Sequence, residues 1–203
     1  MLMKSSLALA LLVCCACGGK RPGSEASAAG PTGHSDVQGT LHGQPFTAAD
    51  SLSYVGTDAA GNSFLTIWVT SFANACGLAS ENSGVRDASV LVLDLSNPGL
   101  SSPGEPGPRS AASQPGEYPV GAAAGGRSAQ AAALHTDDAC RAASLGMGAA
   151  SGTVTLAKLG PSGASGTFDL RFGASGDHLA GAFEAVACPA APLSARAPAT
   201  SCR

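Results

Sequence analysis

The sequence predicts an all-β fold, a single antiparallel β-sandwich or small barrel of about seven to eight short strands behind a disordered N-terminal tether. Short runs rich in β-branched and aromatic residues recur along the chain, and several alternate between apolar and polar residues. Clusters of Gly, Asp, Asn and Ser separate these runs, as turns between strands do. A helical period is weak and confined to residues 139–145.

Four candidate strands lie in the first half of the chain, and turn residues follow the first two. The strands span residues 37–41, 52–56, 64–72 and 89–95, and the turns lie at His42–Gly43 and Asp58–Asn62. Residues 64–72 are dense in β-branched and aromatic residues and are apolar on both faces, which is typical of a central strand. Residues 89–95 have a similar composition.

The last third of the chain has the clearest alternation. Phe168, Leu170 and Phe172 share one face of a predicted strand, and polar residues share the other. Residues 153–159 alternate in the same way, and residues 179–185 repeat the inward pattern after a turn. These segments predict antiparallel strands with one solvated face.

The segment 97–126 is rich in Pro and Gly and is expected to be a surface loop within the folded domain. Proline removes a backbone donor and fixes φ, so a regular strand ladder is not expected here. A polyproline ligand is the alternative interpretation of the same composition.

The N-terminus carries an export signal. Lys4 precedes a leucine-rich run that ends at Ala16, a small residue suited to signal-peptide cleavage, and Cys17 follows at once. This arrangement resembles the signal of bacterial lipoproteins, in which the cysteine after the cleavage site is acylated. Cys14 and Cys15 are alternative processing sites. The domain organisation predicted is a signal peptide over 1–16, a lipid-anchored flexible tether over 17–35 and a β-rich ectodomain over 36–203.

The resemblance implies a location and a membrane partner. Acyl chains such as palmitate on Cys17 would hold the protein on a membrane, because two or more chains give stable anchoring. Gly18 follows the cysteine where an Asp would favour inner-membrane retention, so the resemblance implies the outer membrane of the cell envelope, at its periplasmic or surface face. The run 152–188 is similar to a pattern of uncharacterised small β-rich envelope lipoproteins, which carries no assigned activity.

Four cysteines remain beyond Cys17, and an even number in an exported chain predicts disulfides. They are Cys76, Cys140, Cys188 and Cys202. Three connectivities are possible; we favour Cys76–Cys140 with Cys188–Cys202. A zinc site is excluded because no two of these cysteines have the close spacing of zinc ligands.

Composition and motifs restrict the function. The formal net charge of −3 is mild, which argues against nucleic acid as a partner. The sequence holds no nucleophile elbow, no zinc-protease motif and no phosphate-binding glycine loop. No cofactor is predicted, and the expected partners are the membrane and an envelope protein or cell-wall ligand.

One polar cluster, at residues 135–138, could support chemistry. His135 and Asp137 are two residues apart and could share a metal ion or act as a base and its orienting carboxylate, with His178 as a third group. A solvated turn leading to Cys140 is the favoured interpretation, and His178 is expected to face water. The sequence therefore predicts a non-enzymatic envelope lipoprotein, with no catalytic or metal-binding residue assigned. The alternative is a metal-dependent or hydrolytic envelope enzyme that uses His135 and Asp137.

Overall fold

The computed structural model describes residues 32–102, 105–121, 126–141, 147–173, 176–189 and 201–203. Within these residues the chain forms strands and one short helix, α1 (Ala75–Ser80). The strands are β1 (His34–Leu41), β2 (Gln44–Pro45), β3 (Asp50–Thr57), β4 (Ser63–Thr70), β5 (Ser83–Gly84), β6 (Ser89–Ser102), β7 (Glu105–Ala111), β8 (Gly116–Pro119), β9 (Ser128–His135), β10 (Met147–Gly160), β11 (Gly163–Phe172), β12 (His178–Ala187) and β13 (Ser201–Cys202).

Seven of these strands close into a barrel in the order β11-β10-β9-β6-β4-β3-β12, and β12 pairs back to β11. Each pairing is antiparallel except that of β12 with β3, where Val186 and Ala187 pair in parallel with Leu52 and Ser53. The predicted all-β class is therefore confirmed. The barrel is mixed because β12, which closes it, runs parallel to β3.

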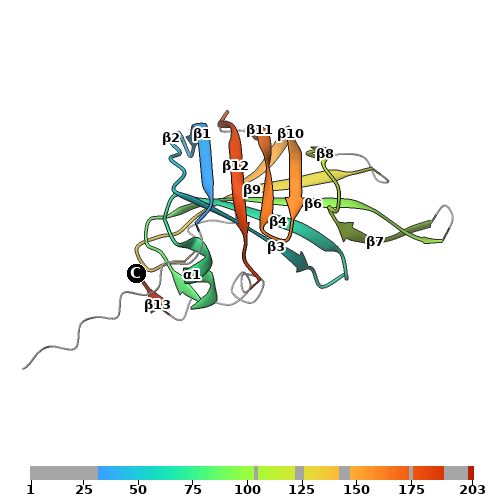
Figure 1. Cartoon of the computed structure of the whole chain (residues 1–203). Coiled ribbons are helices and arrows are strands. Elements are labelled where there is room, and N and C mark those ends of the chain that lie inside the picture. Colours follow the sequence, from blue (N-terminus) through green and yellow to red (C-terminus); the bar gives the residue numbers. More distant parts are fainter. Residues whose placement is uncertain (1–31, 103–104, 122–125, 142–146, 174–175, 190–200) are drawn as a thin grey trace, which may run out of the picture.

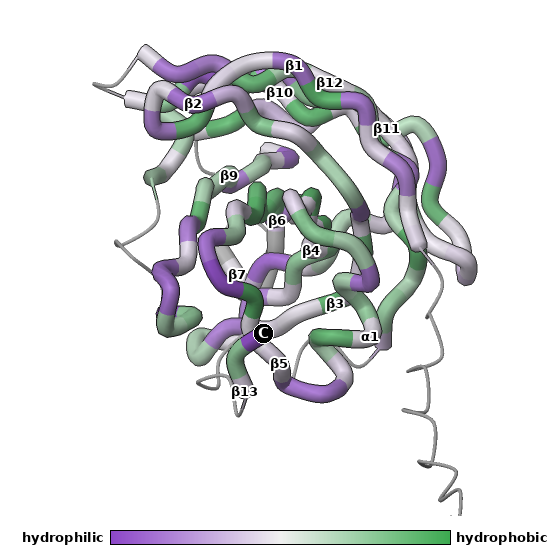
Figure 2. The backbone as a smooth tube through the Cα atoms, turned by 90° about the vertical axis from the view of Figure 1, so that its left-hand side faces the viewer, coloured by the Kyte–Doolittle hydropathy of each residue, from purple (hydrophilic) through white to green (hydrophobic). Residues whose placement is uncertain are grey.

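The barrel is flattened into two layers whose strands cross steeply (Figure 1). Strands β3, β4, β6 and β9 form one layer, and β1, β12, β11 and β10 form the other. Figure 2 looks from the side at right angles to that view, and there β1, β12 and β11 arch over β9, β6 and β4. Helix α1 lies outside the barrel, near the C-terminus.

Apolar side chains fill the space between the two layers. Strands β4, β6, β10, β11 and β12 contribute most of the large ones, which are almost completely buried. They are Leu65, Ile67, Val69, Leu91, Leu93, Leu95, Val154, Leu156, Phe168, Leu170, Phe172, Leu179 and Phe183. Complete burial of one such side chain contributes roughly 1.5–3 kcal/mol, so this cluster is the main source of stability.

The predicted strands are all present, and each is extended at one end or both, although β4 ends at Thr70, two residues before the predicted end. Residues 64–72 were expected to be central, and β4 indeed pairs on both sides, with β3 and with β6. The antiparallel hairpin predicted for the last third is the pair β11–β12. Strand β1 begins at His34, two residues before the expected start of the domain. The weak helical period is not a helix over 139–141, and residues 142–146 lie outside the described part.

The expectation of a surface loop over 97–126 is wrong for the residues in strands β6, β7 and β8, and residues 103–104 and 122–125 lie outside the described part. Strand β6 continues to Ser102 and pairs with β7, while β8 pairs with β10. Pro98 and Pro108 are tolerated because both lie at the register shift between the pairs Asn97–Ser110 and Gly99–Gly107. Strand β7 pairs only with β6, so its other edge does not require backbone donors.

Tyr118 of β8 makes this segment part of the core. The tyrosine is completely buried, and its hydroxyl donates a hydrogen bond to the carbonyl of Gln114. Strand β9 offers the interior only small side chains, Ala129, Ala131 and Ala133, so the ring occupies volume that β9 leaves open.

Two disulfides staple the outside of the barrel, and the favoured pairing is wrong. Cys76 of α1 is bonded to Cys188, and Cys140 is bonded to Cys202. The pairs Cys76–Cys140 and Cys188–Cys202 are excluded by these bonds. All four cysteines are oxidised as predicted, which indicates an oxidising, extracytoplasmic compartment.

Topology explains the connectivity. Helix α1 packs Ala75 and Ala79 against Leu52 of β3, and Cys188 belongs to the same cluster because β12 ends beside β3. Sequence spacing carries no sign of that approach, since Cys76 and Cys188 are 112 residues apart. Among the described residues no helix is long and apolar enough to cross a membrane.

Candidate binding site: an aromatic hollow on the outer wall of the barrel

The outer wall of the layer β3-β4-β6-β9 is hollowed. The hollow has a volume of about 640 Å³ and is open to solvent. Its lining comes from the four strands and from the turn after β3, and it combines aromatic and aliphatic side chains with polar ones. We call it the aromatic hollow, and its central residues are Tyr54, Thr66, Trp68, Val92 and Asp94.

Strand register brings these five residues onto one face. Thr66 of β4 pairs with Tyr54 of β3 on one side and with Asp94 of β6 on the other. Trp68 pairs with Val92 one step further along the same face. Because side chains alternate along a strand, the intervening residues of β4 and β6 point into the core.

Two aromatic rings form perpendicular walls. The ring centroids of Tyr54 and Trp68 are 5.8 Å apart, and the ring planes meet at 83°. This edge-to-face arrangement is a favoured geometry for aromatic pairs. Both side chains line the hollow and are half-buried, and both also pack against the cluster that α1 forms with Leu52 and Cys188.

Asp94 is a carboxylate set into this apolar wall. Its Oδ1 accepts a hydrogen bond from Thr66 Oγ1 at 2.5 Å. Burial raises the pKa of the Asp94 carboxyl above its ordinary value, and the hydrogen bond from Thr66 offsets part of that rise. Among the described residues no basic side chain forms an ion pair with Asp94. The site therefore holds a partly desolvated negative charge without a protein counter-charge.

Gly56 keeps the hollow open. A Cβ at this position would lie 3.4 Å from Cε2 of Tyr54 and 3.6 Å from Oγ1 of Thr66, which are ordinary contact distances. A larger side chain at Gly56 would therefore occupy the space next to Tyr54 without a backbone clash. A substitution of Gly56 by a larger residue can therefore fill the hollow while the backbone stays in place.

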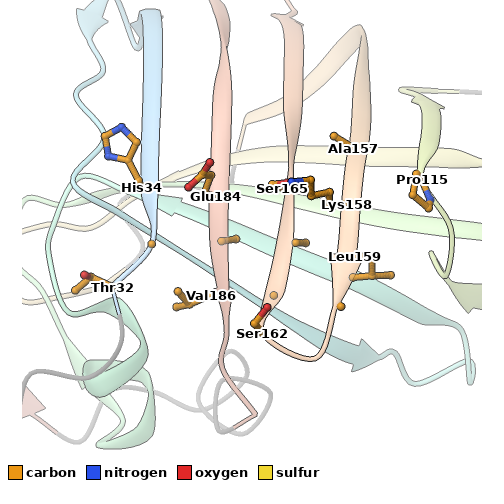
Figure 3. Close-up of a pocket in the computed structure, with 15 residues that line it drawn as sticks. Thr32, His34, Pro115, Ala157, Lys158, Leu159, Ser162, Ser165, Glu184 and Val186 are labelled. Atoms are coloured by element: carbon orange, nitrogen blue, oxygen red, sulfur yellow. The ribbon is translucent and has the colours of Figure 1, made fainter.

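A second hollow, of about 730 Å³, lies on the opposite, polar layer (Figure 3). His34, Glu184, Ser165 and Lys158 form a row across β1, β12, β11 and β10. Ser165 separates Glu184 from Lys158, so their strands lie about 10 Å apart at the usual strand spacing. The charged residues of this row are exposed, and exposed charges contribute little binding energy.

The structure gives each residue that the sequence offered for chemistry a partner of its own. His135 Nδ1 lies 3.1 Å from Ser89 Oγ, at the end of β9. Asp137 Oδ1 accepts hydrogen bonds from the amides of Ala139 and Arg141, so its carboxylate closes a turn. The Arg141 amide is the main cause of the lowered pKa of Asp137.

His178 is the first residue of β12. Its Nε2 is 2.9 Å from Asp169 Oδ1, and both side chains are substantially exposed. The ring of His135 contacts the ring of His42 edge to face, with 6.4 Å between the ring centroids. Within the part of the chain that the structure describes, no three His, Cys, Asp or Glu residues are grouped as metal ligands.

Comparison of the chain with protein-family models, with curated proteins and with solved structures found no match.

Sequence reasoning missed the aromatic hollow, although two signals pointed to it. Asp94 is a single acid inside the apolar run Val90–Leu95, where a charge on the buried face would be unfavourable. Trp68 is the one tryptophan of the chain and lies in a strand that is apolar on both faces. An apolar outer face needs a covering element or a ligand, and among the described residues the α1 cluster packs against Tyr54 and Trp68 on one side of this face.

Proposed function

We propose that the protein is a non-enzymatic binding module, exported and lipid-anchored, whose ligand site is the aromatic hollow. The observation that carries the proposal is Asp94, a partly buried carboxylate without a protein counter-charge in an aromatic wall. Such a group lowers stability, because burial opposes its charged form. Functional sites are where proteins retain groups of this kind.

We place the protein in the cell envelope, where acylated Cys17 would anchor it to the outer membrane. The two disulfides support the coarser part of this location, an oxidising compartment outside the cytoplasm. Cys17 itself lies outside the described residues. A tether between the lipid and Thr32 would let the barrel meet an envelope or cell-wall ligand at a distance from the membrane.

The enzyme alternative has weaker support. It requires His135, Asp137 and His178 to act together, but Asp137 closes a turn through two backbone amides and His178 is paired with Asp169. None of the three lines the aromatic hollow.

The proposal is tested by asking what the hollow retains. Purified domain is equilibrated with a small-molecule extract of bacterial envelopes, washed, and denatured, and the released compounds are identified by mass spectrometry. Gly56→Val is the matched control, because valine suits a strand and fills the hollow. The proposal expects a compound that wild type retains and the variant does not. Equal retention by both folded proteins, or no retention by either, contradicts it.

A further inference from the structure

We infer that the aromatic hollow binds a compact methylated ammonium ion, with the Asp94 carboxylate as its counter-charge and Trp68 and Tyr54 as its walls. This inference rests on the proposed function and adds the chemical class of the ligand. It follows from three properties of the hollow: its charge, the geometry of its rings and the aliphatic groups beside them.

The charge of the hollow is negative. Two carboxylates, Asp58 and Asp94, line it, and no Lys, Arg or His is among its described lining residues. The Asp58 carboxylate is engaged in its own turn, where it accepts hydrogen bonds from the amides of Ala60 and Asn62 and from Asn62 Nδ2. Asp94 accepts one hydrogen bond, from Thr66. A cation is therefore the complementary ligand, and Asp94 is the carboxylate placed to meet it.

The aromatic walls favour the same ligand. The face of an aromatic ring attracts a cation within about 6 Å of its centroid, most strongly for tryptophan. Asp94 lies diagonally across the β4–β6 pair from Trp68, a spacing of roughly 7–8 Å between positions, so a small cation can contact both. The perpendicular rings of Trp68 and Tyr54 enclose a compact group better than a flat sugar, which stacks on a single exposed ring face.

The aliphatic groups beside the rings select among cations. A primary ammonium has three N–H donors that need acceptors, and a guanidinium has five. Val92 stands opposite Trp68, and Leu134 also lines the hollow; neither side chain can accept a hydrogen bond, whereas Gln130, opposite Asp94, can. A methylated ammonium carries its charge on a surface of methyl groups, so it loses no hydrogen bonds there and gains apolar contact.

The test uses Trp68 as the reporter, since it is the one tryptophan in the chain. Choline is titrated into the purified domain while tryptophan fluorescence is followed, with calorimetry as a second readout. The neutral comparison is 3,3-dimethylbutan-1-ol, which has the shape of choline with carbon in place of the charged nitrogen. We expect choline to saturate the signal and to bind about tenfold or more tightly than the neutral alcohol.

Three variants make the result specific. Asp94→Asn keeps the shape and the hydrogen bond from Thr66, and we expect it to weaken choline binding about tenfold or more. Gly56→Val should abolish binding of both compounds. Asp169→Asn removes an exposed carboxylate on the polar layer and should leave choline binding unchanged.

The outcomes separate this inference from the proposed function. Equal affinity for choline and for the neutral alcohol, or no effect of Asp94→Asn, overturns the cationic ligand while a loss with Gly56→Val still supports a binding site. If a neutral sugar such as N-acetylglucosamine saturates the signal and Asp94→Asn does not affect its binding, the cationic ligand is likewise overturned while the binding site is still supported. No choline binding up to about 10 mM overturns the inference, and retention of no compound from the envelope extract overturns the proposed function as well.

Discussion

The Asp50 carboxylate of β3 accepts a hydrogen bond from the backbone amide of Ala75, at the start of α1, with 2.8 Å between Oδ2 and N. Its other oxygen accepts hydrogen bonds from the amides of Gly33 and Ser51, each at 2.7 Å. Asp50 is almost completely buried. One side chain therefore fixes the first described segment, strand β3 and the helix relative to one another.

Asp50→Asn should destabilise the protein by about 1–3 kcal/mol, because its amide NH₂ would face a backbone N–H and leave a buried donor unsatisfied. Chemical denaturation measures the free energy of unfolding, and the exposed Asp169→Asn change is the matched control. Unfolding free energies of the two variants that agree within about 0.5 kcal/mol would contradict this role of Asp50.

The disulfide connectivity can be read directly. Peptide mapping under non-reducing conditions should find Cys76 linked to Cys188 and Cys140 linked to Cys202. Replacing both Cys76 and Cys188 by Ser should lower the free energy of unfolding by roughly 2–5 kcal/mol, since that bond closes the longer loop. A peptide that joins Cys76 to Cys140 would show that the arrangement of α1 against β12 is wrong.

Asp94→Asn should stabilise the folded protein at neutral pH. Burial raises the pKa of Asp94 in the folded state above its unfolded value, so its contribution to stability is greatest at acid pH and is lost as pH rises through the raised pKa. The variant lacks this loss. Its advantage in unfolding free energy should therefore shrink as the pH falls toward the ordinary carboxyl range near about 4. Denaturation curves of both proteins at several pH values check this, and an advantage that does not change with pH would contradict it.

Tyr118 should be essential to the barrel. Tyr118→Ala removes a completely buried ring and should destabilise by about 3–5 kcal/mol, the range for deleting a large aromatic side chain from a core. Tyr118→Phe keeps the ring and loses only the hydrogen bond to Gln114, so a loss of about 1 kcal/mol is expected. Thermal unfolding distinguishes them; similar small losses in both would mean that the segment is the surface loop its composition suggested.

The proposed lipid anchor predicts that Cys17→Ser prevents acylation and processing at this position. The variant should accumulate with its signal peptide attached, and labelled palmitate should not be incorporated. Fractionation with mass measurement of the N-terminus checks both points. A processed, membrane-bound form of the variant would move the anchor to Cys14 or Cys15.

Much of the fold was accessible from the sequence because alternation reports burial directly. Phe168, Leu170 and Phe172 predict a strand, since every second residue of the segment is large and apolar. Strand β9 gives no such signal, because its inward residues are alanines and alanine is not typical of strands. Strand β7 was obscured by its prolines, whose effect depends on an edge position that only the pairing reveals.

The candidate site was not accessible in the same way. The aromatic hollow depends on which residues of β3, β4 and β6 stand opposite one another, and register is a property of pairs of strands. His135 and Asp137 attracted attention because they are close in sequence. Tyr54 and Asp94 are 40 positions apart and become neighbours of Thr66 only when the sheet forms.

Strand β12 pairs with β1, β11 and β3, so it supplies a hydrogen-bonding partner to the edges of three strands. The contacts that it makes with β1 and β3 span well over a hundred positions, which places this barrel among slow-folding, high-contact-order topologies. Until residues 178–187 have emerged from translocation, β3 and β1 have open edges that could pair with other chains. A chain that ends before β12 would leave both of these edges unpaired, and exposed edges of this kind promote aggregation.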